Sequence, residues 1–216
     1  MKIGNIIVYD IETGGFSREK NGLAEIAMIA IDIVTLEEVD RYEAVIAPYD
    51  NLEGIRVTYT SEALKVNGLT MKQIENGKPG KEVVAEMMAF AKKHKRASKK
   101  PMLCGHNIEK FDNPWIDYFF LCFKKDASKH FENWCIDTMW WSALKWPLSG
   151  EGEEVLKPNL GTYGKEVGIK LSIAHSAMHD TEANAKLAVT FLKALRGDTV
   201  VVEQEAKERT RTAFQM

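Results

Sequence analysis

The hydrophobic and polar positions of this chain follow two different periods. Short apolar runs rich in β-branched and aromatic residues predict strands at 4–10, 24–33, 38–47, 101–105 and 133–136. Apolar residues three and four positions apart predict helices at 60–67, 81–96, 113–124, 137–145, 159–167 and 179–195. Three strands followed by an alternation of strands and helices predict an α/β fold, in which helices flank a mixed sheet.

Two carboxylates share one face of the first predicted strand. Residues 6 to 9 are apolar, and Asp10 and Glu12 follow them just before a pair of glycines. Because side chains alternate along a strand, Asp10 and Glu12 point to one side of it and Ile11 points to the other. Neighbouring carboxylates repel each other when they lose water, and a bound cation removes that repulsion. The pair therefore indicates either a cation site or an acidic strand end that faces water.

A third carboxylate, Asp112, lies where a predicted strand is followed by a helix. Pro114 suits the first turn of a helix, and we expect Asp112 or Asn113 to be the N-cap. Trp115 and Phe119 recur at helical spacing, so this helix is expected to pack on the sheet. The turn would then place the Asp112 carboxylate at the end of the sheet. The alternative is an ordinary capping aspartate.

A fourth carboxylate, Asp180, continues the apolar stripe of the last predicted helix. That stripe consists of Ala183, Leu187, Ala188, Phe191, Leu192 and Leu195. A carboxylate that faces inward is unusual, and a bound metal ion explains its position better than solvent does. His175 comes five residues earlier, in the loop expected before the helix, and we expect it to face the same site.

Three motifs in this order resemble those of the DnaQ-like 3′–5′ exonucleases of the ribonuclease H-like superfamily. They are Asp10-Ile-Glu-Thr-Gly14, Gly105-His-Asn-x-x-x-Phe-Asp112 and His175-x-Ala-x-x-Asp180. This family includes the proofreading subunits of replicative polymerases, RNase T and oligoribonuclease. The resemblance covers about residues 3–196. Because His175 stands five residues before Asp180, and Ser176 stands where a second subtype carries tyrosine, the chain resembles the DEDDh subtype.

The resemblance implies a five-stranded ribonuclease H-like sheet and a catalytic site of Asp10, Glu12, Asp112, Asp180 and His175. The four carboxylates would hold two divalent cations, and hard oxygen ligands select Mg²⁺ or Mn²⁺. Asp10 would bridge both ions. His175 would accept the proton of the attacking water, which suits a side chain that titrates near neutral pH.

The resemblance also implies a substrate and a product. Backbone around Thr13 and Gly14 would grip the terminal 3′ nucleotide, and Asn107 and Phe111 are further candidates for lining that pocket. Nucleoside 5′-monophosphates would be released from single-stranded 3′ ends, and we expect DNA as the substrate, in proofreading or repair. A DNA polymerase or clamp is a candidate partner. The alternatives are an exoribonuclease of the same subtype and a non-catalytic module that binds nucleic acid or a polymerase.

Composition changes this picture little. The chain has 216 residues and 45% hydrophobic content, enough for one core. We expect an exonuclease domain at 1–196 and a short charged tail at 197–216. A net charge of −2 does not predict a protein that coats a duplex. Basic stretches at 92–100 and 124–129 are candidates for phosphate contact.

Cysteine usage and hydropathy bear on location. The three cysteines are odd in number and without a spacing pattern, which favours buried free thiols and a reducing cytoplasm. No apolar run approaches the roughly 18 residues that a membrane span needs, so we expect no membrane partner.

Overall fold

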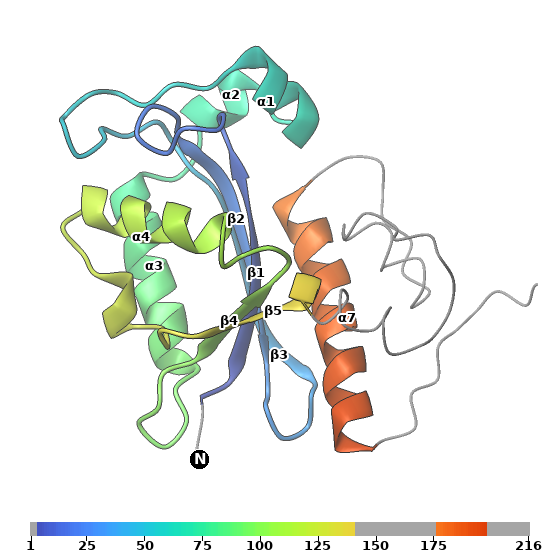
Figure 1. The fold of residues 1–216 in the computed structure, drawn as a ribbon. Helices are drawn as coiled ribbons and strands as arrows, with labels where there is room; N and C mark the ends of the chain where they lie inside the picture. Colours follow the sequence, from blue (N-terminus) through green and yellow to red (C-terminus); the bar gives the residue numbers. More distant parts are fainter. Residues whose placement is uncertain (1–3, 141–175, 198–216) are drawn as a thin grey trace, which may run out of the picture.

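The computed structural model describes residues 4–140 and 176–197, and a five-stranded sheet forms its centre (Figure 1). The strands are β1 (Ile6–Thr13), β2 (Leu23–Ile31), β3 (Glu38–Val45), β4 (Met102–Gly105) and β5 (Cys135–Asp137). They lie in the order β3-β2-β1-β4-β5. The pairs β1–β2 and β2–β3 are antiparallel, whereas β1–β4 and β4–β5 are parallel. The predicted α/β fold with a mixed sheet is confirmed.

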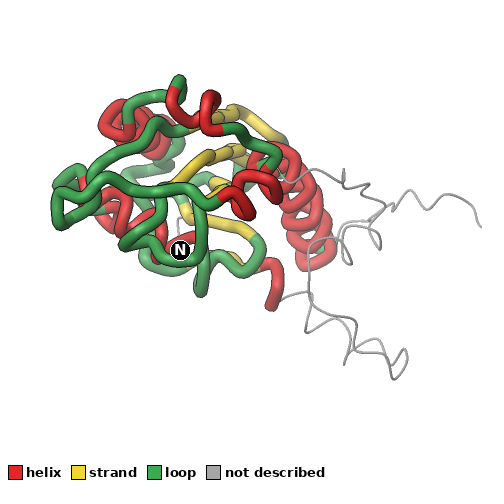
Figure 2. Tube along the Cα trace, turned by 90° about the horizontal axis from the view of Figure 1, so that it is seen from above, coloured by secondary structure: helices red, strands yellow, loops and turns green. Residues whose placement is uncertain are grey.

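Helices cover both faces of this sheet. They are α1 (Ser61–Asn67), α2 (Met71–Glu75), α3 (Gly80–Lys93), α4 (Asp112–Cys122), the short 3-10 helix η1 (Ala127–Lys129) and α7 (Ala177–Arg196). Of the described helices, Figures 1 and 2 show α7 against one face and α3 and α4 against the other. Tyr9 and Ile11 of β1 belong to the core on the α3 and α4 side, whereas Ile6 and Val8 pack with α7. By strand alternation, Asp10 and Glu12 therefore face α7.

Some predicted boundaries differ from the structure. β1 continues to Thr13, so Asp10 and Glu12 lie inside the strand. Helix α4 begins at Asp112 with Phe111 as its N-cap, so the prediction of Asp112 or Asn113 as the cap was wrong. The Asn113 side chain instead accepts a 2.6 Å hydrogen bond from the hydroxyl of Tyr9. This bond ties the start of α4 to the central strand.

The predicted helices at 137–145 and 159–167 are only partly open to comparison. Asp137 ends β5 and is not helical, and residues 138–140 are helical. Residues 141–145 and 159–167 lie outside the described residues, as does the tail from 198 onward. Helix α2 was not predicted. A capping box formed by Thr70 and Gln73 begins it, and this pair is a recognisable signal in the sequence.

The apolar stripe predicted for α7 is shorter than expected. Ala183, Leu187 and Ala188 are buried, but Leu195 is 75% exposed. The reason is the position of the last turn, where Arg196 donates hydrogen bonds to the carbonyl oxygens of Ile33 and Val34 in the turn after β2. The end of α7 thus lies over a surface turn and not over the core.

The cysteines are free thiols, as predicted, but only Cys104 is fully buried. Cys122 and Cys135 are partly exposed. Among the helices that the structure describes, none is long and apolar enough to cross a membrane.

Candidate active site

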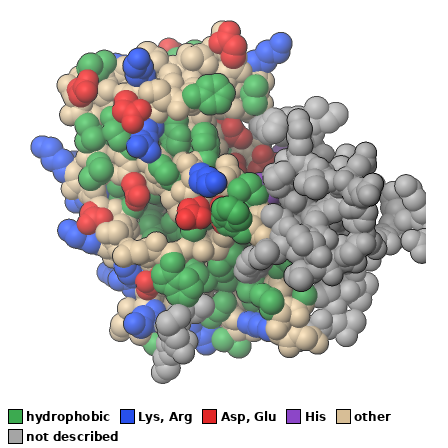
Figure 3. Space-filling view, in the orientation of Figure 1, with side chains coloured by type: hydrophobic (Ala, Val, Ile, Leu, Met, Phe, Trp, Pro, Cys, Tyr) green, Lys and Arg blue, Asp and Glu red, His purple; other side chains and the backbone are tan. Residues whose placement is uncertain are grey.

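Three of the predicted catalytic carboxylates lie together between β1 and the start of α7. One oxygen atom from each of Asp10, Glu12 and Asp180 lies within 4.8 Å of the other two. The first two side chains extend from β1, and Asp180 belongs to the first turn of α7. Acidic side chains are visible in a recess of the face drawn in Figure 3. Three hard oxygen ligands at this spacing suit a divalent cation.

Asp112 approaches the same place from α4. It is the first residue of that helix and only 3% exposed. It is not one of the three residues whose oxygens lie within 4.8 Å of one another, yet its charge raises the pKa of Asp10 more than that of any other residue. Burial raises the pKa of Asp112 itself, whereas the backbone N–H groups of Asp112 and Ile11 oppose this rise. Asp112 is thus held against β1, near Asp10.

The electrostatics of the site favour a bound cation. Burial, together with the charges of Asp180, Glu25 and Asp112, raises the pKa of Glu12 to about 8. Burial also raises the pKa of Asp10 well above its usual value, with the neighbouring carboxylates adding to the effect. Among the described residues, the charged neighbours that raise the pKa values of Asp10 and Glu12 are all carboxylates. Such a cluster ionises fully only when positive charge enters it, so the residues fit a divalent metal.

Glu25 is a member of this acidic cluster that the motifs did not reveal. It lies on β2 directly opposite Glu12 and is 6% exposed. Its Oε2 accepts a 3.0 Å hydrogen bond from the backbone N–H of Ala177, at the start of α7. The signal in the sequence is a single acidic residue within an otherwise apolar strand. Only the strand pairing shows that it faces Glu12.

The predicted general base, His175, lies outside the described residues, so its role stays a prediction. The structure describes α7 from Ala177, with Ser176 as its N-cap. His179, next to Asp180, is exposed in the first turn of the same helix.

Thr13 and Gly14 form the end of β1 and the residue after it. The Thr13 hydroxyl donates to the carbonyl oxygen of Gly15 at 2.9 Å. The Gly14 N–H donates to Gly22, and its carbonyl accepts from Thr60, both at 2.8 Å. A Cβ atom on Gly14 would lie 2.5 Å from the Tyr59 ring. Close packing inside the protein therefore already explains the glycine at this position.

Asn107 and Phe111 lie in the segment that joins β4 to α4. Asn107 adopts a left-handed backbone conformation with φ of 63°, which asparagine tolerates well. Its N–H donates to the Asp137 side chain at 2.8 Å. Phe111 is the N-cap of α4, and its ring lies 6.3 Å from that of Trp115.

Phe111 also lines a shallow pocket of about 190 Å³ beside the glycine turn. The other lining residues are Phe16, Arg18, Glu19, Lys110, Pro114 and Trp115. Thr13, Gly14 and Asn107 do not line it. Phe16 is 98% exposed, so an aromatic ring and two basic side chains meet at a solvent-accessible place. Its position two residues after Gly14 was the only sequence signal for Phe16.

The fold and the site together define a class of protein. A mixed sheet with this strand order, carboxylates on its central strand and further carboxylates at two helix starts make a ribonuclease H-like nuclease domain with a divalent metal site. The family model for exonuclease, of the RNase T type, matches residues 7–188. The chain therefore belongs to this exonuclease family, within the DnaQ-like 3′–5′ exonuclease superfamily.

Relatives and solved structures agree with this assignment. The PolC-type DNA polymerase III of Bacillus cereus is 27% identical over 187 residues, which are 87% of this chain and 11% of the polymerase. That of Staphylococcus saprophyticus is 27% identical over 197 residues, which are 90% of this chain and 12% of the polymerase. The chain thus spans about a tenth of the length of these relatives, which are much larger proteins.

Among solved structures, E. coli exonuclease I in complex with a dT13 oligonucleotide matches with a TM-score of 0.71 and 19% identity, covering 89% of this chain and 42% of that one. The zinc-bound complex of the same enzyme with single-stranded DNA gives a TM-score of 0.72, also at 19% identity, covering 89% of this chain and 41% of that one. At this identity the likeness shows the shared fold.

Proposed function

We propose that this chain is a metal-dependent 3′–5′ exonuclease that removes nucleoside 5′-monophosphates from single-stranded DNA, in proofreading or repair. The observation that carries this proposal is the convergence of Asp10, Glu12 and Asp180 in a chain of the exonuclease family. A non-catalytic binding module has no use for a buried acidic cluster that costs stability without a cation.

The residues of the site divide the work of phosphodiester hydrolysis. Asp10, Glu12, Asp112 and Asp180 would hold two Mg²⁺ or Mn²⁺ ions. When bound, such ions supply an activated water and neutralise charge on the phosphoryl oxygens. His175 is proposed to accept the proton of that water.

The pocket beside the glycine turn supports a single-stranded substrate. An exposed aromatic ring such as Phe16 offers a base a stacking surface, and Arg18 and Lys110 offer charge to nearby phosphates. The backbone at Thr13 and Gly14, with Asn107 and Phe111, is proposed to contact the terminal nucleotide. We favour DNA over RNA for two reasons. The relatives are named as DNA polymerases, and the solved exonuclease I complex contains a dT13 oligonucleotide, which is DNA.

The setting of this activity is also a proposal. We place the exonuclease domain at residues 1–196, with 197–216 as a separate tail, in the cytoplasm. The similarity to one segment of PolC-type polymerases supports a DNA polymerase or clamp as a partner.

The test is degradation of single-stranded DNA and RNA of identical sequence, each labelled at the 5′ end, in Mg²⁺ or Mn²⁺. We expect a ladder that shortens from the 3′ end, faster on DNA, and absent in EDTA and in Asp10→Ala. Faster cleavage of RNA would favour the exoribonuclease alternative. Failure to cut either strand in either metal would contradict the proposed activity.

A further inference from the structure

Asp137 is a buried carboxylate that contacts the loop before α4 and is not one of the three clustered acids Asp10, Glu12 and Asp180. It ends β5, is 6% exposed, and accepts three backbone hydrogen bonds. The donors are the N–H groups of Asn107 at 2.8 Å, Met139 at 3.0 Å and Glu109 at 3.2 Å. Two of these donors belong to the loop that leads from β4 to Asp112. Asp137 therefore fixes the shape of the segment that presents a metal ligand.

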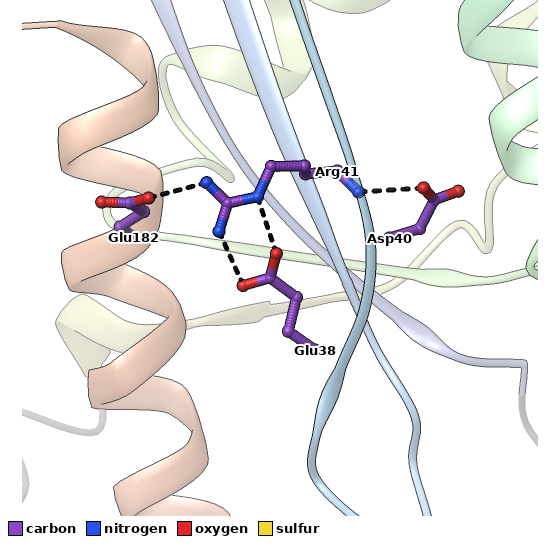
Figure 4. A network of polar contacts seen from close by, with 4 residues as sticks. All are labelled: Glu38, Asp40, Arg41 and Glu182. Carbon is purple, nitrogen blue, oxygen red and sulfur yellow. Dashed lines mark hydrogen bonds and ion pairs between the residues drawn. The ribbon is translucent and has the colours of Figure 1, made fainter.

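Glu25 has the same relation to the other helix. Its Oε2 accepts the N–H of Ala177, three residues before Asp180. This bond joins α7 to β2 across the sheet face that carries Glu12. The exposed contact between Arg41 and Glu182 also joins α7 to the sheet, at 2.8 Å (Figure 4).

The two contacts differ in how strongly they hold α7 against the sheet. The Arg41 and Glu182 side chains are 49% and 38% exposed, and exposed pairs of this kind contribute little. Glu25 is buried, so loss of its bond would leave the Ala177 N–H without a partner, which is unfavourable. A carboxylate directly opposite Glu12 is also unfavourable by charge. The hydrogen bond to Ala177 explains why an acid occupies this unfavourable position.

We propose that Asp137 and Glu25 are positioning residues for the metal-binding carboxylates, and this inference rests on the proposed function. Asp10 and Glu12 are fixed by the hydrogen-bonded ladder of β1. Asp112 and Asp180 come from helix starts, which no strand ladder fixes. Asp137 positions the first of these helix starts and Glu25 the second, in each case by accepting backbone N–H groups.

The test for Glu25 compares two substitutions. Glu25→Gln keeps an oxygen for the Ala177 N–H and removes the charge, whereas Glu25→Leu removes both. We expect Glu25→Gln to bind Mn²⁺ within about threefold of the wild type. Glu25→Leu should bind it about 10–100-fold more weakly, the range for loss of a group that orients metal ligands. Titration calorimetry measures the affinity, and a raised Mn²⁺ concentration should restore much of the kcat of Glu25→Leu.

For Asp137 we expect Mn²⁺ affinity to fall stepwise across two substitutions. Asp137→Asn keeps one of the two acceptor oxygens and Asp137→Ala keeps neither, so Mn²⁺ affinity should fall from wild type to Asn to Ala. Glu43→Ala is the matched control, because it removes an exposed acid on the same sheet face as Glu25 that caps no helix. Its Mn²⁺ affinity should equal that of the wild type.

Two outcomes would overturn the proposal for Glu25 or for both residues, and a third would overturn it for Asp137. Equal loss in Glu25→Gln and Glu25→Leu would mean that the charge acts on the metal directly. Unchanged Mn²⁺ affinity in Glu25→Leu and Asp137→Ala, with cooperative thermal unfolding, would show that neither residue positions a ligand. If Asp137→Asn and Asp137→Ala both bind Mn²⁺ as tightly as the wild type, Asp137 is not a positioning residue, and the proposal for Glu25 is unaffected. Absence of Mn²⁺ binding by the wild type is distinguishable from all three, since it contradicts the proposed metal site itself.

Discussion

Asp10 and Glu12 occupy positions of β1 where the strand otherwise buries apolar side chains against α7. Ile6 and Val8, on the same face, are 1% and 0% exposed. Replacing two apolar positions by carboxylates sacrifices burial and adds repulsion, which shows in the raised pKa values of both acids. These two carboxylates therefore destabilise the metal-free protein, and a bound cation would remove that destabilisation.

Asp10→Asn should separate activity from stability. The substitution removes the carboxylate on which the other acids of the cluster converge, so we expect exonuclease activity to fall at least about 100-fold, beyond the usual effect of losing a supporting group. The metal-free protein should unfold at a temperature equal to or higher than that of the wild type, because one repelling charge is gone. Thermal unfolding in EDTA, beside the end-label assay, measures both. A lower unfolding temperature for Asp10→Asn would contradict this account of the repulsion.

The stability of the metal-free protein should depend on pH with a defined sign. The pKa of Glu12 is about 8 in the folded protein, against an ordinary value of 4.5. An acid with a raised folded pKa binds its proton more tightly in the folded state, so its contribution favours folding at low pH and is lost as pH rises toward 8.

Unfolding temperatures in EDTA should therefore fall between pH 5.5 and pH 8, and Mn²⁺ should reverse the trend, because metal ligands bind deprotonated. Glu12→Gln should flatten the slope in EDTA. A metal-free protein that gains stability across this range would refute the assignment.

Phe16→Ala tests the stacking surface. Stacking of a base on an aromatic ring contributes about 1–3 kcal/mol, so KM for a short single-stranded DNA should rise at least about fivefold, with a smaller change in kcat. Leu195→Ala is the control, since that side chain is also exposed and lies at the far end of α7. Equal KM values for Phe16→Ala and the wild type would remove Phe16 from the substrate site.

The site lies near the end of strand β1 and at the starts of helices α4 and α7. Strand alternation in the sequence was enough to place Asp10 and Glu12 on one face. The exact start of α4 was not predictable, because Asn113 finds a partner in Tyr9, 104 residues away, and not in its own backbone. The local pattern favoured a polar N-cap, and tertiary contact made Phe111 the cap.

Glu25 and Asp137 show the limit of local patterns more clearly. Each looks like an isolated acid in or beside a strand. Their partners lie 152 residues away for Glu25 and 28 to 30 residues away for the loop contacts of Asp137. Only the assembled sheet brings these groups together. Local patterns singled out Asp112 and Asp180 at helix starts, but only the resemblance to a family joined them to Asp10 and Glu12 in one site.

Gly14→Ala tests whether packing explains the glycine turn. An added Cβ would lie 2.5 Å from the ring of Tyr59 and 2.8 Å from the carbonyl oxygen of Thr58. Such overpacking costs about 1–3 kcal/mol of unfolding free energy, measurable by urea denaturation. In a Tyr59→Leu background the additional cost should shrink, because part of the clash is relieved. The same cost in both backgrounds would exclude the ring as the cause.

At the scale of the molecule, the strand order places β1 at the centre of the sheet, with helix starts reaching it from both faces. The same topology argues against phosphate contact by the basic stretch at 92–100. The carbonyl of His94 accepts from the N–H of Asn5, before β1 begins. At about 3.3 Å per residue, this stretch lies roughly 20 Å along the strand from Glu12. Lys93 also pairs with Asp40 at 2.7 Å.

We propose that carboxylates from β1, α4 and α7 form one site for two divalent cations. The most direct test is a Mn²⁺ titration followed by calorimetry and electron paramagnetic resonance, on the wild type and on Asp10→Ala. We expect two ions per wild-type chain, close enough for their spins to couple, and loss of that coupled pair in Asp10→Ala. A wild type that binds no Mn²⁺, or an Asp10→Ala variant that binds the same coupled pair, would contradict the proposed two-metal site.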